Sequence, residues 1–244
     1  MGGKILLIHV WGLSYLKAVI LAGGFGKRLK PLTDSIPKPL LEVGGKPILV
    51  RQIEWLNLHG INEAILCIGF LKEKVIQHIG NGRRFGAKIG YVVEEEPLGT
   101  GGALLNAEPL LSKEDSFMVL NGDILTNLDP QLLKRELNSY VGSIALVPLR
   151  SPYGIVDFDG NDRVLNFNEK PTLDSYWINA GVYWLTPRVF NFLEDKSNIE
   201  TTAFPRMAKE GKLKAVRYKE CFWKSIDVYK DIEEAEKELE HQVT

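Results

Sequence analysis

The chain has 244 residues, enough for one large domain with a substantial hydrophobic core. Apolar residues make up 45% and charged residues 25%, which excludes disordered, fibrous and disulfide-scaffold proteins. The formal net charge of −1 gives no overall positive field for nucleic acid or an anionic membrane, so we expect neither as a partner.

The first fifteen residues contain a lysine followed by an apolar run. Lys4 and the apolar run 5–13 resemble the start of a secretory signal, but the run is too short to span a bilayer and no small-residue cleavage site follows it. We expect residues 1–15 to be an N-terminal extension, either an extra packed segment or an addition upstream of the natural start.

Cys67 and Cys221 lie far apart without zinc-type spacing, which fits a cytoplasmic protein.

Strand-like and helix-like patterns alternate through the first half of the chain. The predicted strands are 17–21, 63–68, 88–93 and 117–120, and the predicted helices are 47–59, 72–79 and 100–110. This alternation predicts an α/β fold, a Rossmann-like three-layer sandwich with a mostly parallel central sheet.

The pattern changes after Asp123, where strands follow one another with fewer helices between them. The predicted strands are 143–149, 154–157, 164–168 and 178–185, and a solvated helix is predicted over 228–239. Phe158-Asp-Gly-Asn161 is typical of a hairpin turn between two of these strands. We therefore expect a small additional β region in the C-terminal half.

The loop after the first strand is rich in glycine. Gly23, Gly24 and Gly26 would let backbone amides approach phosphate oxygens, with positive charge from Lys27 and Arg28 beside them. The same glycines are equally compatible with a simple strand-to-helix turn. Two common phosphate-binding templates do not fit, because the third glycine of GxGxxG and the GK[ST] ending are both missing.

The continuation of this loop is more specific. Residues 24–33 read GFGKRLKPLT and residues 37–40 read PKPL. With the preceding strand, these residues resemble the sugar-phosphate nucleotidyltransferase family, and the resemblance extends from Leu16 to the C-terminus. With GTP as the donor, the sequence resembles the mannose-1-phosphate and heptose-1-phosphate guanylyltransferases of this family. The heptose-1-phosphate enzymes share the segments 99–103 (GTGGA) and 178–183 (INAGVY).

The resemblance implies an enzyme, with residues 16–244 as its nucleotidyltransferase domain. The enzyme would join a sugar 1-phosphate to a nucleoside triphosphate and release pyrophosphate and a nucleotide sugar. Lys38 would steady the triphosphate and Arg28 would neutralise the leaving pyrophosphate, so both roles are electrostatic. No second activity is expected, because the sequence ends without the β-helix or acyltransferase extension of larger relatives.

Two aspartates are candidate ligands for Mg²⁺. Asp123 follows an apolar strand, at the edge where open α/β sheets bind ligands, although an aspartate there is also a common helix cap. Asp227 ends the segment FWKSID, which resembles the family's second metal-binding motif. Two carboxylates with phosphate oxygens and water suit Mg²⁺. Asp123 is therefore counted among the catalytic residues with Arg28 and Lys38.

The resemblance also implies the residues around each substrate. The residues expected to bind the nucleotide are Leu21, Ala22, Gly23, Gly24, Gly26, Lys27, Glu94, Leu98, Gly99 and Thr100. Those expected to bind the sugar phosphate are Gly154, Glu169, Lys170, Asn179 and Gly181, with Lys170 on the phosphate and Glu169 on sugar hydroxyls. Outside the family context, Glu169 and Lys170 would be an ordinary exposed pair near a turn.

The segment 94–103 resembles the family's base-reading segment, in which the residue five before Gly99 contacts the base edge, and here that residue is Glu94. A carboxylate only accepts hydrogen bonds, and guanine alone offers two adjacent donors. This favours GTP and a mannose-1-phosphate guanylyltransferase. Some uridylyltransferases also carry glutamate here, and Glu95 or Glu96 would take the role in a shifted register.

Two alternatives stay open. One is a thymidylyl- or uridylyltransferase acting on glucose 1-phosphate or an amino-sugar 1-phosphate. The other is a catalytically inactive, nucleotide-sugar-sensing regulatory subunit. A homo-oligomer is compatible with the sequence, which does not give its size.

Overall fold

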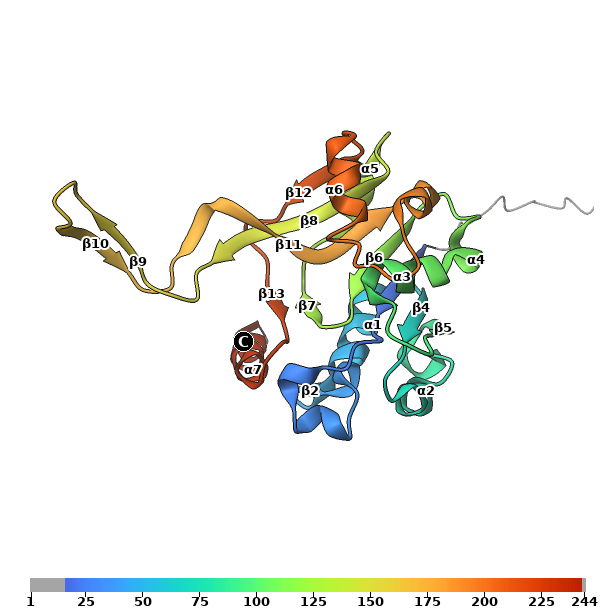
Figure 1. Ribbon diagram of the computed structural model, residues 1–244. Coiled ribbons are helices and arrows are strands. Elements are labelled where there is room, and N and C mark those ends of the chain that lie inside the picture. Colours follow the sequence, from blue (N-terminus) through green and yellow to red (C-terminus); the bar gives the residue numbers. More distant parts are fainter. Residues whose placement is uncertain (1–15, 243–244) are drawn as a thin grey trace, which may run out of the picture.

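A seven-stranded sheet forms the centre of the molecule in the computed structural model, which describes residues 16–242 (Figure 1). The proposed extension at 1–15 lies outside the described residues. The strands, in spatial order, are β12 (Leu213–Arg217), β8 (Gly142–Arg150), β11 (Thr172–Leu185), β6 (Phe117–Asn121), β1 (Lys17–Leu21), β4 (Glu63–Ile68) and β5 (Lys88–Val93). Only β11 pairs antiparallel with its neighbours, so the sheet is mostly parallel, as predicted.

Helices cover both faces of this sheet because the strands are apolar on both. In β1, Ala18 and Ile20 pack into one core cluster and Val19 into another, following the two-residue period of a strand. The first cluster includes residues of α1 (Ile48–Leu58), α2 (Lys72–Ile79) and α5 (Pro130–Leu137). The second includes residues of α3 (Gly99–Asn106), α4 (Glu108–Leu111) and α6 (Ala203–Lys209). The predicted three-layer sandwich is confirmed.

The helix predicted over 100–110 is two helices in the structure. The pattern over 100–110 predicts a single helix, but the structure divides it into α3 and α4 at Ala107. Pro109 explains the break, since it has no N–H to donate to the preceding turn and its ring disfavours a continuous helix. The helices α5 and α6 and the edge strand β12 were not predicted.

Two short ribbons lie outside the main sheet, and the second of them joins the C-terminal part of the chain to the loop after β6. β2 (Glu42–Val43) pairs with β3 (Lys46–Pro47), and β7 (Ile124–Thr126) pairs with β13 (Trp223–Ser225). The helix α7 (Tyr229–Gln242) packs Ile232 and Ala235 into a third, smaller hydrophobic cluster with Leu29, Leu125 and Phe222. This cluster holds the segment after β13 beside the loops that follow β1 and β6.

A hairpin made of β9 (Ile155–Phe158) and β10 (Val164–Asn168) projects from the body of the molecule (Figure 1). It confirms the turn predicted at 158–161. Among the helices in the described part of the chain, none has the length and apolar character needed to cross a membrane.

The glycines of the GTGG segment pack directly on a distant loop. The N–H groups of Gly101 and Gly102 both donate to the Ser197 carbonyl, at 2.8 and 3.2 Å. A Cβ atom on Gly102 would lie 2.2 Å from the Asp195 carbonyl oxygen, so only glycine fits there. This contact fixes the N-terminus of α3 against the 195–199 loop.

We predict that Gly102→Ala lowers the free energy of unfolding by about 1–3 kcal/mol, because the added methyl overpacks a backbone contact. The matched control is Gly90→Ala in β5, where a Cβ atom meets nothing within 4 Å. It should stay within about 0.5 kcal/mol of wild type. Urea denaturation followed by circular dichroism measures both, and equal midpoints for the two variants would contradict the packing argument.

Candidate active site

A cavity of about 370 Å³ opens at the carboxyl ends of β1 and β6. Leu21 and Asn121, the last residues of these strands, are register partners, and Gly122 N donates to the Leu21 carbonyl at 2.9 Å. Open α/β sheets bind ligands at this edge. The predicted site residues that line the cavity are Leu21, Ala22, Gly23, Gly24, Gly26, Lys27, Arg28, Lys38, Glu94, Gly99, Thr100, Asp123 and Asp227.

The glycine loop forms one wall of this cavity. Gly26 adopts a left-handed backbone conformation, with φ of 61°, immediately before the 3₁₀ turn Lys27–Leu29. Its carbonyl accepts a hydrogen bond from Thr33 Oγ1 at 2.9 Å, which ties the loop to the downstream part of the motif. The glycines therefore shape a backbone wall that a phosphate chain can approach closely.

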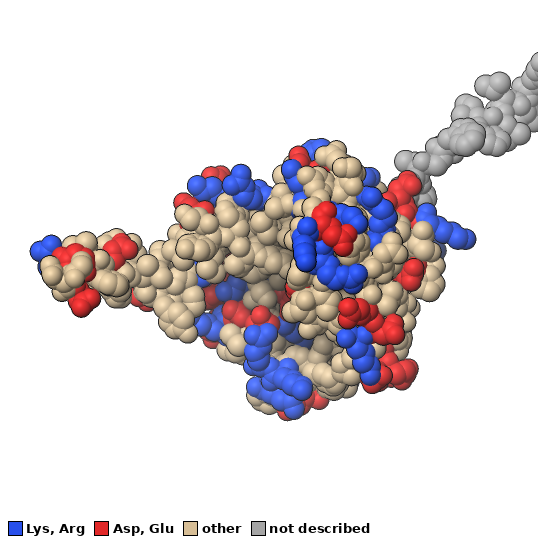
Figure 2. Space-filling model, turned by 45° about the horizontal axis from the view of Figure 1, so that its top comes forward, with Lys and Arg blue, Asp and Glu red and all other residues tan. Residues whose placement is uncertain are grey.

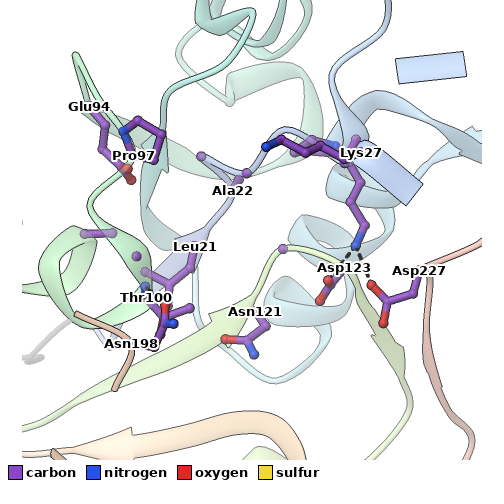
Figure 3. A pocket seen from close by; sticks show the side chains of 18 of the residues that line it. Leu21, Ala22, Lys27, Glu94, Pro97, Thr100, Asn121, Asp123, Asn198 and Asp227 are labelled. Carbon is purple, nitrogen blue, oxygen red and sulfur yellow. Dashed lines mark hydrogen bonds and ion pairs between the residues drawn. The ribbon is translucent and has the colours of Figure 1, made fainter. Parts of the chain in front are cut away.

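Four charged side chains from distant parts of the chain meet beside that wall. Lys38 Nζ lies 2.6 Å from Asp123 Oδ2 and 3.1 Å from Asp227 Oδ1. Figure 3 draws these two contacts as dashed lines that end on the labelled side chains of Asp123 and Asp227. Arg28 adds a contact of 2.8 Å to Asp227 Oδ1. Burial raises the pKa of Asp227, but Lys38 and Arg28 together outweigh burial, so this pKa lies below its usual value. Asp227 is therefore ionised at neutral pH.

Local structure explains why these groups converge. Lys38 stands between Pro37 and Pro39, whose fixed φ angles restrict the backbone, and its side chain is only 13% exposed. The pairing of β7 with β13 continues into the hydrogen bond from Ile226 N to the Asp123 carbonyl, at 2.9 Å. That bond sets Asp227 next to Asp123.

Glu94 lies at the opposite end of the cavity (Figure 3). It is 8% exposed, and a Cβ atom on Gly23 would lie 2.7 Å from its Oε1 atom. Its Oε2 atom accepts a hydrogen bond from Leu98 N at 3.3 Å. Leu98 itself does not line the cavity, and this hydrogen bond is its contribution to the site. Burial raises the pKa of Glu94, and the bond from Leu98 opposes this only in part.

The neighbouring glutamates do not share this position. Glu95 forms an ion pair with Lys72 at 3.1 Å, and Glu96 forms one with Lys196 at 2.8 Å. Neither glutamate lines the cavity. Glu94 is therefore the residue of this acidic run that faces the cavity.

A hydrogen-bond network connects Thr100, which lines the cavity, to β11. Thr100 Oγ1 donates to Glu200 Oε2 at 2.6 Å, and the Tyr183 hydroxyl donates to Glu200 Oε1 at 3.3 Å. Asn179 Nδ2 donates to that hydroxyl at 2.8 Å, and Asn179 Oδ1 accepts from Gly181 N at 2.9 Å. The network fixes Asn179 and Gly181 relative to Thr100.

The structure separates the residues predicted for the sugar phosphate into two groups. Gly181 adjoins the cavity, because a Cβ atom there would lie 3.0 Å from Nδ2 of Asn121, which lines it. Gly154, Glu169 and Lys170 belong to the base of the projecting hairpin and do not line the cavity.

Six further residues line the cavity without having been predicted. They are Pro39, Pro97, Ala103, Asn121, Gly122 and Asn198. Asn121 and Gly122 directly precede Asp123, so their position at the end of an apolar strand was a usable signal. Asn198, whose Oδ1 atom accepts a hydrogen bond from Thr100 N at 3.3 Å, comes from a remote loop and carried no such signal.

Comparison with known proteins places this site in context. The family model described as nucleotidyl transferase matches residues 17–242. The chain is 37% identical over 225 residues to the mannose-1-phosphate guanylyltransferase catalytic subunit beta of Danio rerio, covering 88% of this chain. It is 36% identical over 226 residues to the mannose-1-phosphate guanyltransferase of Aspergillus oryzae, again covering 88% of this chain. The alignments span 62% of the length of these curated relatives.

Solved structures agree with the family model. HddC from Yersinia pseudotuberculosis superposes with a TM-score of 0.74 at 30% identity, covering 92% of this chain and 99% of HddC. The same protein complexed with GMP-PN gives a TM-score of 0.73 at 29% identity, with the same coverage. The match along 17–242 and the identity to these relatives lead to one conclusion: the chain belongs to the nucleotidyl transferase family.

Proposed function

We propose that this protein joins a sugar 1-phosphate to a nucleoside triphosphate and releases pyrophosphate and a nucleotide sugar. The observation that carries the proposal is the meeting of Lys38, Arg28, Asp123 and Asp227 beside a glycine wall. Phosphoryl-type transfer needs positioning and charge stabilisation more than covalent chemistry, and this cluster supplies both signs of charge in one place.

The two cations have complementary positions in this proposal. Lys38 is nearly buried and held by prolines, which suits a fixed contact to the triphosphate, while the Arg28 side chain is 70% exposed at the mouth. Arg28 can then follow the departing pyrophosphate. Attack of the sugar phosphate on the α-phosphorus proceeds in line, without a covalent intermediate on the enzyme.

The donor set at the cluster fits Mg²⁺. Asp123 and Asp227 already converge on one cationic group, the Lys38 ammonium, and both are hard oxygen donors. No group of three or more histidine, cysteine or carboxylate side chains with metal-binding geometry occurs among residues 16–242. A pair of carboxylates with phosphate and water oxygens is the usual Mg²⁺ shell, and the ion would neutralise charge on the two reacting phosphates.

GTP is the nucleotide that Glu94 suits best. Its carboxylate is buried at the far end of the cavity from the charge cluster and offers only acceptors, which match the two adjacent donors of guanine. The guanylyltransferase names of the relatives and the GMP-PN complex of HddC support the same base.

Mannose 1-phosphate is the sugar substrate that we propose, making the product GDP-mannose. The support is the identity to mannose-1-phosphate guanylyltransferases over most of this chain. A panel of GTP, UTP, dTTP and ATP crossed with mannose, glucose and heptose 1-phosphates, scored by pyrophosphate release, tests the pair directly. Preference for dTTP or UTP would instead favour the glucose or amino-sugar alternative, and nucleotide-sugar binding without turnover would favour a regulatory subunit.

We predict that Asp123→Asn and Asp227→Asn each lower kcat by at least about 10²-fold, because each removes a charge from the centre of transition-state stabilisation. Glu210→Gln is the control, since Glu210 pairs with Lys212 on the surface and away from the cavity. Melting temperatures establish that the folds persist. Near-full activity in either aspartate variant would refute its assigned role.

Glu94→Gln should lower kcat/KM for GTP by roughly 10- to 100-fold, the value of a hydrogen bond to a buried charged group. The amide replaces one acceptor by a donor, so activity with UTP or dTTP should rise relative to GTP. Glu95→Gln is the matched control and should leave base preference unchanged, because Glu95 points away from the cavity to Lys72. Unchanged base preference in Glu94→Gln would contradict the base assignment.

Glu94 also predicts a pH dependence. Its pKa is raised by burial, so the carboxylate that accepts from guanine becomes protonated at a higher pH than an exposed glutamate would. KM for GTP should therefore rise on acidification before exposed carboxylates titrate. The Glu94→Gln variant should lack this acid-side rise in KM for GTP. The same rise in both proteins would mean that a group other than Glu94 causes it.

A further inference from the structure

One of the cations that line the cavity is not paired with a carboxylate. Three positively charged side chains and three carboxylates line the cavity. Lys38 and Arg28 are both paired with aspartates of the site. Lys27, the third cation, forms no ion pair among residues 16–242. Its positive charge is therefore fully available to a bound phosphate.

The outer surface supplies no field that would attract phosphate in place of this side chain. On the face shown in Figure 2, acidic and basic side chains lie interspersed, and neither sign forms a broad field. The formal net charge of the whole chain is −1. A ligand with several phosphates must therefore be held by individual side chains at the cavity.

The Lys27 ammonium lies over the ring of Phe25, with Nζ 5.5 Å from the ring centroid. Gly26, with φ of 61°, turns the chain between these two residues. The ring attracts the cation without neutralising it, because the ring carries no net charge. An ammonium group has three N–H donors, so this contact leaves donors free for a ligand. The ring thus restricts the flexible lysine stem while the charge stays available.

Packing in the hydrophobic core does not explain the aromatic residue at position 25. Phe25 is 40% exposed and does not line the cavity. It belongs to none of the three hydrophobic clusters formed by residues 16–242. Its ring contacts that of Phe70, with the centroids 5.2 Å apart and the planes tilted by 46°. The ring of Phe25 therefore lies between a second aromatic ring and the Lys27 ammonium.

Phe70 fixes this arrangement relative to the glycine loop. It lies in the connection between β4 and α2, and its N–H donates to the Gly23 carbonyl at 3.3 Å. A Cβ atom on Gly69 would lie 3.1 Å from the same carbonyl oxygen, so the two segments are in close backbone contact. Leu71, the next residue, has a left-handed backbone with φ of 51°, which is uncommon for a residue with a side chain. The backbone thus holds Phe70 beside the loop that carries Phe25.

We propose that Phe25, supported by Phe70, is a positioning residue that presents the Lys27 ammonium to the β- and γ-phosphates of the nucleotide. Lys27 directly precedes Arg28, to which we assign the leaving pyrophosphate, so both cations serve the end of the triphosphate that departs. A lysine already held near its bound position loses less side-chain entropy when the ligand binds. The inference rests on the proposed function, because it requires a triphosphate ligand.

Binding of inorganic tripolyphosphate with Mg²⁺, measured by isothermal titration calorimetry, tests this role without a base, a sugar or turnover. Lys27→Met should weaken binding roughly 10-fold, because it removes a charged contact. Phe25→Leu should weaken binding about 2- to 5-fold, since leucine keeps an apolar contact with Phe70 but offers no ring to the ammonium. Phe25→Tyr should restore the binding that Phe25→Leu loses. Phe158→Leu is the matched control, because Phe158 is 63% exposed on β9 and does not line the cavity.

A double-mutant cycle separates the positioning of Lys27 from general support of the loop. Lys27→Met/Phe25→Leu should bind tripolyphosphate no more weakly than Lys27→Met alone, because Phe25 acts through the ammonium. Affinity for GMP, which lacks the outer phosphates, should not change in any of these variants. Melting temperatures establish that the folds persist. Additive losses in the double variant, or wild-type binding in Phe25→Leu, would overturn the proposal.

Steady-state kinetics distinguish failure of this inference from failure of the proposed function. With the nucleotide that the wild type uses best, Phe25→Leu should raise KM for that nucleotide and leave kcat close to the wild-type value, as expected for a lost binding contact. An unchanged KM in a wild type that does turn over would overturn the positioning role alone. A wild type that binds neither tripolyphosphate nor any nucleoside triphosphate would overturn the proposed function together with this inference.

Discussion

The site depends on one ammonium group shared by two carboxylates. Lys38 Nζ contacts Asp123 and Asp227, residues that lie 85 and 189 positions away along the sequence. Bringing two like-charged carboxylates together is costly unless a cation lies between them, and Lys38 supplies that cation. The loops after β1 and β6 and the segment after β13 are therefore held together by the charges that we assign to the chemistry.

Hydrogen bonds from neighbouring helices hold the backbone that carries the two aspartates. Gln52 of α1 is 2% exposed, and its Nε2 atom donates to the carbonyls of Asn121 and Ile124 at 3.0 and 2.8 Å. These bonds hold both ends of the turn that carries Asp123. On the other side, Asp231 Oδ2 accepts from Asp227 N at 2.8 Å and fixes the start of α7. Each carboxylate thus has a rigid backbone before any substrate binds.

The sequence predicted the part of the fold that follows from local periodicity. The strands at 63–68 and 88–93 and the helix at 72–79 have the bounds that were expected, since apolar period and turn residues mark both ends. The edge strand β12 was missed because it is short and its three apolar residues, Leu213, Ala215 and Val216, do not alternate regularly with its charged residues. Its pairing with β8 is decided by tertiary packing, which a local pattern does not contain.

The same division between local and long-range information explains which residues of the candidate site could be predicted from the sequence. Residues that sit in a strand-end loop, such as Gly23 or Asp123, were predictable because the end of a parallel strand is where ligands bind. Asn198 reaches the cavity only because Gly101 and Gly102 lack side chains and let the 195–199 loop pack on α3. Lys170 belongs to a strong motif yet does not line the cavity, since it lies at the root of the hairpin between β10 and β11. A local motif marks candidate residues, whereas sheet register and tertiary packing decide which of them line the cavity.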